Sequence, residues 1–203
     1  MSAKVYKGDL PNHLSFSGSV AVDTETLGLK PHRDRLCVVQ LSGGDGKAYL
    51  VQIPRGDQNA PNLRAILHNP DILKIFHYAR FDLAVLYHYC GVMAQPVYCT
   101  KIASKLARTY TDRHGLKDLC RELLGVDLSK QQQSSDWGTE KLSDEQKAYA
   151  ASDVLYLHEL KDKLDSMLKR EERGEFAAAC YEFLPTRVRL DLAGWHDDDI
   201  FAH

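Results

Sequence analysis

Four carboxylates and one phenol stand in three separated segments of the chain. Asp23 and Glu25 lie in VAVDTETLGL. Asp82 lies in FHYARFDL, and Tyr149 and Asp153 lie in YAASDVLYL. Acidic oxygens gathered in one cleft suit hard divalent cations such as Mg²⁺ or Mn²⁺, and a pair of such ions supports phosphodiester hydrolysis. These residue types therefore favour a phosphodiesterase site with two metal ions.

The spacing inside each segment fits this interpretation but also has an ordinary explanation. Alternate side chains of a strand share a face, so Asp23 and Glu25 should point the same way. Tyr149 and Asp153 are four residues apart and should share one face of a helix. Asp82 is expected in the first turn of a helix, where the helix dipole favours any acidic residue. A polar strand end, a helix cap and a core tyrosine beside a surface aspartate would explain each segment singly, so only their joint occurrence favours a site.

The elements that would position these residues alternate along the first half of the chain, and helices dominate the second half. A capping box of Ser143 and Gln146 should begin the longest helix. This pattern is typical of an α/β fold with a sheet covered on its faces. Strands are expected at 17–23, 36–42, 47–53, 72–77 and 96–100, and helices at 63–68, 81–91, 100–110, 115–125, 142–176 and around 177–185.

Length and composition limit the possible architectures and partners. With 203 residues the chain should form one domain, 1–203, with a core at about 19–168 and a C-terminal helical segment and tail at 169–203. The 26 basic and 28 acidic residues give a net charge of −2, and the lack of a large basic surface favours short nucleic acids over long ones. Five cysteines without a CxxC pair and no apolar run of membrane-spanning length predict a cytoplasmic protein without a membrane partner.

The three segments resemble the exonuclease motifs of the DEDD superfamily, in its tyrosine-bearing subclass. The stretch QSSDWGTEKLSDEQKAYAASDVLYL is similar to the corresponding stretch of ribonuclease D. The resemblance implies a ribonuclease H-like fold, in which a mixed five-stranded sheet is flanked by helices, and hydrolysis from the 3′ end that releases nucleoside monophosphates. It further implies that Tyr149 orients the attacking water and that two Mg²⁺ or Mn²⁺ ions are held by Asp23, Glu25, Asp82 and Asp153.

A narrower resemblance concerns the substrate. TYTDRHGLKDLC, SKQQQSSDWG and LDLAGWHDDDIFAH are similar to stretches of the nanoRNase C family, short ribonuclease D relatives of alphaproteobacteria. This resemblance implies a diribonucleotidase that takes short 5′-phosphorylated RNA, above all dinucleotides, and assembles as a ring-shaped homo-octamer. Two alternatives stay open: an exonuclease of the ribonuclease D type that trims longer RNA 3′ ends or degrades DNA, and a catalytically silent RNA-binding scaffold.

The segment after Glu25 should contact the 3′ nucleotide. Leu29 lies six residues after Asp23, the offset at which a leucine of the oligoribonuclease family separates two bases. An apolar wedge of this kind suits single strands, although a buried loop leucine would fit the pattern equally well. Thr26 and Leu27 should line the same pocket.

Further substrate contacts are expected on two other segments. His77 and Phe81 flank Asp82, and Phe81 would either stack on a base or fill the core. Arg113 and His114 are candidates for binding the 5′ phosphate, because arginine offers a bidentate donor pair. In a ring these donors would come from a neighbouring subunit, and as single residues they would otherwise be surface charges.

Overall fold

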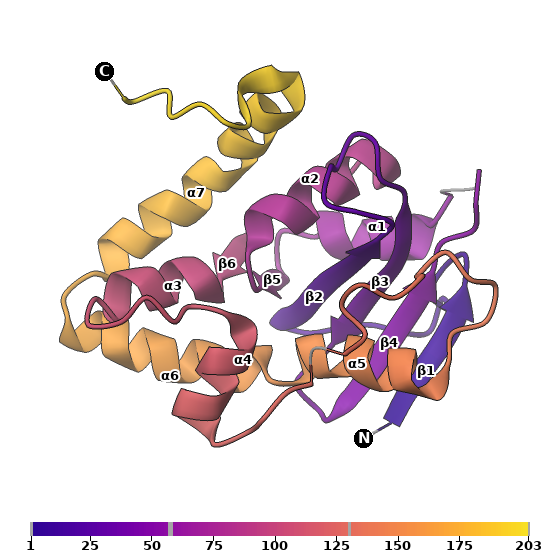
Figure 1. The fold of residues 1–203 in the computed structure, drawn as a ribbon, viewed down its shortest axis with the longest axis horizontal. Coiled ribbons are helices and arrows are strands. Elements are labelled where there is room, and N and C mark those ends of the chain that lie inside the picture. The colour runs from indigo at the N-terminus through magenta and orange to yellow at the C-terminus, as the bar shows by residue number, and fades with distance from the viewer. Residues whose placement is uncertain (1, 57–58, 130, 203) are drawn as a thin grey trace.

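The computed structural model describes residues 2–56, 59–129 and 131–202. Its centre is a six-stranded sheet in the order β1-β4-β3-β2-β5-β6 (Figure 1). The central strands β2, β3 and β4 pair antiparallel, and β1, β5 and β6 add parallel pairings at the two sides. The strands are β1 (Ser2–Lys7), β2 (Ser19–Thr26), β3 (Leu36–Ser42), β4 (Lys47–Gln52), β5 (Leu73–Phe76) and β6 (Val97–Cys99).

The α/β fold with a mixed sheet is confirmed, but the expectation of five strands is wrong by one. The additional strand is β1, which pairs in parallel with β4 from Ser2 opposite Lys47 to Lys7 opposite Gln52. As an edge strand it has only one neighbour, and Val5 is 36% exposed. Such a strand needs no continuous apolar run, so the N-terminal sequence gave little indication of it.

Helices cover both faces of the sheet (Figure 1). Helices α1, α2 and part of α7 pack against one face, and α3, α5 and α6 pack against the other. All five cysteines are free thiols and only Cys180 is exposed. The helices are α1 (Pro61–His68), α2 (Ala79–Cys90), α3 (Thr100–Ala107), α4 (Leu116–Leu119), α5 (Asp144–Leu155), α6 (Leu157–Arg170) and α7 (Gly174–Leu190), with π-helical turns η1 (Cys120–Leu124) and η2 (Asp191–Trp195).

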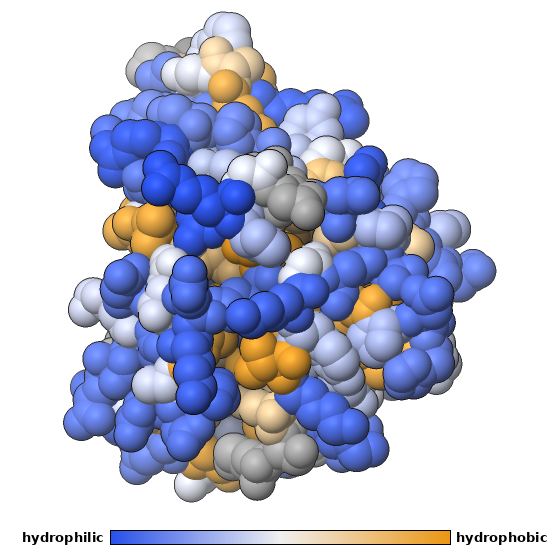
Figure 2. Space-filling view, turned by 90° about the vertical axis from the view of Figure 1, so that its right-hand side faces the viewer, coloured by the Kyte–Doolittle hydropathy of each residue, from blue (hydrophilic) through white to orange (hydrophobic). Residues whose placement is uncertain are grey.

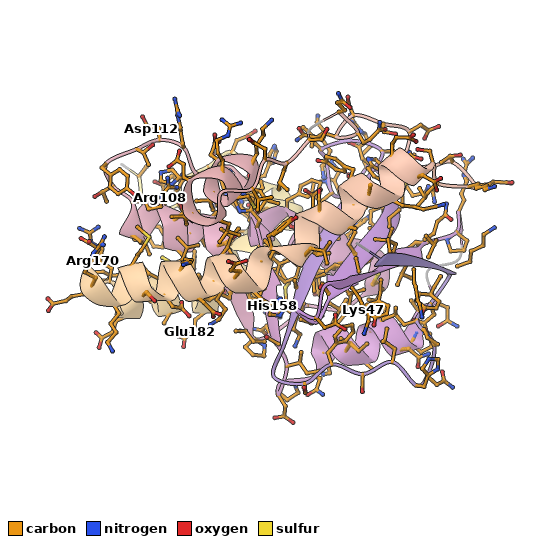
Figure 3. All side chains as sticks on the ribbon, turned by 90° about the horizontal axis from the view of Figure 1, so that it is seen from below. Lys47, Arg108, Asp112, His158, Arg170 and Glu182 are labelled. Carbon is orange, nitrogen blue, oxygen red and sulfur yellow. The ribbon has the colours of Figure 1, made fainter. Side chains whose placement is uncertain are left out.

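The single helix expected at 142–176 is wrong at its end, because α6 stops at Arg170 and α7 begins at Gly174, and the part before Arg170 is two helices, α5 and α6. They meet at Tyr156, whose backbone angles of φ −103° and ψ −4° depart from the helical values. The apolar spacing continues through the break, so the sequence pattern does not reveal it. The break lets α5 pack on β2, β3 and β4 while α6 packs on α3 and β5 (Figure 3, where His158 and Arg170 mark α6). The predicted capping box is confirmed, with Ser143 and Gln146 exchanging bonds of 3.2 and 2.9 Å.

Strand β2 contributes to both cores because its side chains alternate. Val20 and Val22 belong to the core under α1 and α2, whereas Ala21 belongs to the core under α3, α5 and α6. Continuing the alternation, Asp23 and Glu25 should face the α5 side and Thr24 the α2 side. The end of this strand therefore reaches both helical layers.

The surface gives no indication of a membrane-spanning element. Among the described residues, each helix falls short of the length and apolar character that crossing a bilayer requires. Figure 2 shows one face of the molecule as mainly hydrophilic, with hydrophobic residues in small separate groups.

Candidate active site

The carboxyl-terminal part of β2 places two acidic side chains beside helix α5. Asp23, Glu25 and Asp153 each offer one carboxylate oxygen, and these three oxygens lie within 4.8 Å of one another. Thr24 points to the other side of the strand and donates from Oγ1 to Oδ1 of Asp82 at 2.7 Å. The alternation predicted for this strand is thus seen in the contacts of its side chains.

Asp82 reaches the site from the first turn of α2 and is 3% exposed. The residue before the helix, Tyr78, has a φ of +68° and no side chain caps the helix start. Asp82 lies outside the close group of three carboxylates in this structure, but the charge of Asp23 still acts on it. The fourth carboxylate therefore reaches the end of β2 from α2, on the opposite face of the sheet from α5.

The electrostatics of this group favour binding of a cation. Burial raises the pKa of Asp23 to about 7. Burial, followed by the charges of Asp23, Asp153 and Asp82, raises the pKa of Glu25 to about 10. Burial and the charge of Asp23 also raise the pKa values of Asp82 and Asp153 well above the ordinary range. These carboxylates cannot all ionise near neutral pH without a compensating positive charge.

Tyr149 lies one helical turn from Asp153 on α5 and forms a hydrogen bond with it. Burial and the neighbouring charge of Asp153 raise the pKa of the phenol above its usual value. The phenol is therefore neutral at physiological pH and acts as a hydrogen-bonding group. The ring of the buried Trp137 packs 6.0 Å from the Tyr149 ring, centroid to centroid, and supports it from the core.

A cleft of about 710 Å³ joins these groups with most of the predicted substrate-contacting residues. Gln133, Ser134 and Ser135 extend it, and Leu128 and Ser129 line another part of its wall. The predicted residues that line it are Asp23, Glu25, Thr26, Leu27, Leu29, His77, Phe81, Asp82, Tyr149 and Asp153.

Leu29 is 85% exposed and Leu27 is 52% exposed at this cleft. The alternative that Leu29 is a buried loop leucine is therefore wrong. Thr26 donates from Oγ1 to the carbonyl of Gly28 at 2.5 Å, which fixes the turn between the two leucines. Two apolar side chains are thus offered to any ligand that occupies the cleft.

His77 is a neutral hydrogen-bonding residue at the cleft. Thr100 donates its hydroxyl proton to the carbonyl of Phe76 at 3.2 Å. His77 Nδ1 lies 2.9 Å from the same hydroxyl oxygen and must therefore supply the proton of that bond, which leaves Nε2 as an acceptor. Burial lowers the pKa of the imidazole to about 3. Phe81 packs against the core, as one expectation had it, and also lines the cleft.

Arg113 and His114 do not line the cleft as the described residues form it. Arg113 is exposed, and His114 Nδ1 lies 2.8 Å from Ser104 Oγ. The buried Arg108 fixes this loop by donating to the Arg113 carbonyl at 2.8 Å (Figure 3, which labels Arg108 and Asp112). Binding of a phosphate across a subunit boundary stays a prediction for both residues.

Sequence reasoning missed several residues at the site. Gln40 on β3 is fully buried opposite Asp23 and donates from Nε2 to Oδ2 of Asp23 at 3.1 Å. A glutamine inside the otherwise apolar LCVVQLS was the available signal. Lys101 was also missed: it lines the cleft together with Lys117, and its Nζ lies 4.2 Å from the ring centroid of Tyr78. These lysines bring positive charge to a wall of the cleft.

Comparisons with known proteins agree with this geometry. Residues 8–169 match the sequence model of the 3′-5′ exonuclease family. A solved structure of Brucella melitensis NrnC bound to pGG is 60% identical, has a TM-score of 0.97, and is matched over 100% of this chain and 99% of that chain. Brucella melitensis NrnC with bound Mg²⁺ is 59% identical with a TM-score of 0.96, and each chain is covered completely.

A curated relative extends the comparison to a longer protein. Ribonuclease D of Gluconacetobacter diazotrophicus is 33% identical over 160 residues, which are 79% of this chain and 40% of the relative. This chain spans about two fifths of the length of such ribonuclease D relatives. The match to the family model, from residue 8 to residue 169, contains Asp23, Glu25, Asp82, Tyr149 and Asp153.

Proposed function

The chain belongs to the 3′-5′ exonuclease family, and on this basis we propose that it is a metal-dependent exoribonuclease that hydrolyses very short 5′-phosphorylated RNA, above all dinucleotides. The observation that carries the proposal is the cleft in which four carboxylates, one phenol and the exposed Leu29 meet. The similar nuclease that was solved bound to pGG supports the choice of a dinucleotide. The products would be nucleoside 5′-monophosphates.

The residues at the strand end fit divalent metal ions. Three carboxylate oxygens from Asp23, Glu25 and Asp153 lie within 4.8 Å of one another. Burial raises the pKa values of all three groups, and neighbouring carboxylate charges add to the effect for Glu25 and Asp153. Hard oxygen donors of this kind suit Mg²⁺ or Mn²⁺. We propose that these three residues and Asp82 hold two such ions. When bound, the ions supply a lower pKa for a water molecule and charge stabilisation for the leaving 3′ oxygen.

Tyr149 orients the water for attack and does not act as a base in this proposal. Its raised pKa keeps the phenol protonated, and its hydrogen bond to Asp153 fixes its position beside the carboxylates. Trp137 packs against the ring and limits its movement. A neutral phenol that donates its proton to Asp153 can still accept one hydrogen bond from a water molecule at a fixed place.

The remaining walls of the cleft would recognise the nucleotide. Leu27 and Leu29 offer exposed apolar surface to bases, and contact of this kind accepts any base sequence. His77 offers one neutral acceptor nitrogen. Lys101 and Lys117 line the same cleft and are suited to binding a phosphate of the substrate. A short ligand would satisfy these contacts within one cleft.

A length series tests the substrate. Purified protein with Mg²⁺ is incubated with 5′-phosphorylated RNAs of two to seven nucleotides, and initial rates are compared at equal concentrations. The proposal predicts that the dinucleotide is cleaved fastest. Equal or faster cleavage of the longer RNAs would instead favour the ribonuclease D-like alternative, which the curated relatives make reasonable.

The oligomeric state is a separate part of the proposal and rests on resemblance to the nanoRNase C family. We propose a homo-octamer that acts in the cytoplasm. Light scattering on the purified protein gives the mass directly. A monomer in solution would contradict the octamer without affecting the assignment of the catalytic cleft.

A further inference from the structure

The C-terminal segment is tied to the helix that carries Asp82. Arg80 is two residues before Asp82 on α2, and Asp191 begins η2, which follows α7. Arg80 donates from Nε and one terminal nitrogen to both carboxylate oxygens of Asp191, at 2.6 and 2.8 Å. The same terminal nitrogen donates to the carbonyl of His196 at 2.7 Å. A bidentate pair of this kind fixes orientation as well as distance.

A second arginine, Arg187 on α7, also pairs with Asp191. Arg187 pairs with Asp191 at 2.9 Å and donates to the carbonyls of Trp195 at 2.6 Å and Asp198 at 2.9 Å. The side chain of Asp191 is 11% exposed, so its two ion pairs are largely shielded from water. We call Arg80, Arg187 and Asp191 the C-terminal clamp.

The clamp is attached to a helix start that no side chain caps. Tyr78 precedes α2 in the left-handed region, which costs energy for a residue with a β-carbon, and no side chain caps the helix. Beyond this point α7 packs against α2 (Figure 1). The first turn of α2 is therefore held by the buried contacts of Ala79 and Leu83 on one side and by the clamp at Arg80.

We propose that the C-terminal clamp positions Asp82, and with it the metal affinity of the site. The inference rests on the proposed function, because it requires Asp82 to be a ligand. The backbone of Asp82 belongs to α2 while its carboxylate accepts a hydrogen bond of 2.7 Å from Thr24 on β2, so a shift of the helix against the strand would displace the carboxylate. Metal ligands tolerate displacements of only about 0.2 Å. Arg80 and Asp191 are thus positioning residues, and they touch no reacting atom.

The test compares Asp191→Ala with Asp127→Ala. Asp127 forms a similar pair with Arg121 at 2.7 Å, but on the exposed surface at the end of η1. Mn²⁺ binding is measured by calorimetry, and the Mg²⁺ dependence of dinucleotide cleavage is measured in parallel. Asp191→Ala should raise the metal concentration for half-saturation about tenfold, as for other outer-shell partners. It should leave kcat at saturating metal close to the wild-type value, and Asp127→Ala should resemble wild type in both assays.

Two further variants keep the test decisive if Asp191→Ala folds poorly. Arg80→Lys keeps the charge and loses the bidentate geometry, so it should show an intermediate metal affinity. Asp191→Glu should restore most of the affinity. A folded Asp191→Ala protein with unchanged Mn²⁺ affinity would overturn the inference. Absence of both Mn²⁺ binding and cleavage in the wild type would overturn the proposed function instead, so the two failures are distinguishable.

Discussion

Replacing Gln40 by leucine should separate the stability of this protein from its metal affinity. Gln40 is fully buried on β3, donates one hydrogen bond to Asp23 Oδ2 at 3.1 Å, and within the described residues has no partner for its Oε1. A hydrogen bond to a charged group contributes roughly 1.5–3 kcal/mol, whereas an unsatisfied buried acceptor costs about 1–3 kcal/mol. Leucine removes both and has a similar shape.

The lost hydrogen bond and the removed unsatisfied acceptor have nearly equal and opposite energies, so Gln40→Leu should change the free energy of unfolding by less than about 1 kcal/mol. Asp23 would lose the group that orients it, and loss of such an outer-shell partner weakens metal binding by about 10–100-fold. Urea denaturation measures the first quantity, and Mn²⁺ calorimetry measures the second. Gln52→Leu is a matched control, because Gln52 donates to the carbonyl of Thr139, outside the catalytic cleft. A folded Gln40→Leu protein with wild-type Mn²⁺ affinity would refute the reasoning.

Three other predictions concern residues of the cleft. Asp153→Ala should abolish turnover, and an activity assay that finds turnover retained would contradict the site assignment. In EDTA the same variant should have a higher free energy of unfolding by urea, because it lacks a buried, repelled carboxylate whose pKa is raised. Leu29→Ala should lower kcat/KM for a dinucleotide about tenfold, because the contact with the bases is lost. The melting temperature should stay unchanged, since the side chain is 85% exposed. Unchanged kinetics would exclude insertion of Leu29 between the bases. His77→Asn should make the free energy of unfolding fall less steeply as the pH is lowered below neutrality. The folded imidazole has a pKa of about 3 and the unfolded one about 6.5, so the unfolded chain binds more protons between these values and stability falls as pH falls. At pH 5 this amounts to about 2 kcal/mol, measured as the difference in slope between variant and wild type, and parallel curves would count against it.

Local spacing predicted much of the site. Asp23 and Glu25 alternate with Thr24 as a strand requires, and Tyr149 and Asp153 lie one helical turn apart. The capping box that begins α5 was also readable, because it depends on residues three apart. These features are fixed by neighbours in the sequence.

Features that depend on distant partners could not be read in this way. Gln40 becomes meaningful only when β3 pairs with β2 opposite Asp23. The break at Tyr156 follows from the different surfaces under α5 and α6, and the apolar spacing passes through it unchanged. Arg80 and Asp191 are 111 residues apart, and neither stands in a recognisable motif.

Because side chains of β2 face both helical layers, the strand links the site to the detachment of either layer from the sheet. Asp23, Glu25 and Asp153 meet on the side of one helical layer, while Asp82 arrives with the other layer and bonds to Thr24. If these four carboxylates hold two divalent ions, as proposed, detachment of either layer removes ligands, so the binding energy of the ions opposes both movements. Hydrogen exchange should therefore slow on both sides of the sheet when Mg²⁺ is added, including amides of α2 and α5 that lie far from the carboxylates. The proposed ions would thus connect the two helical layers through one strand, and only the fully folded chain would retain them.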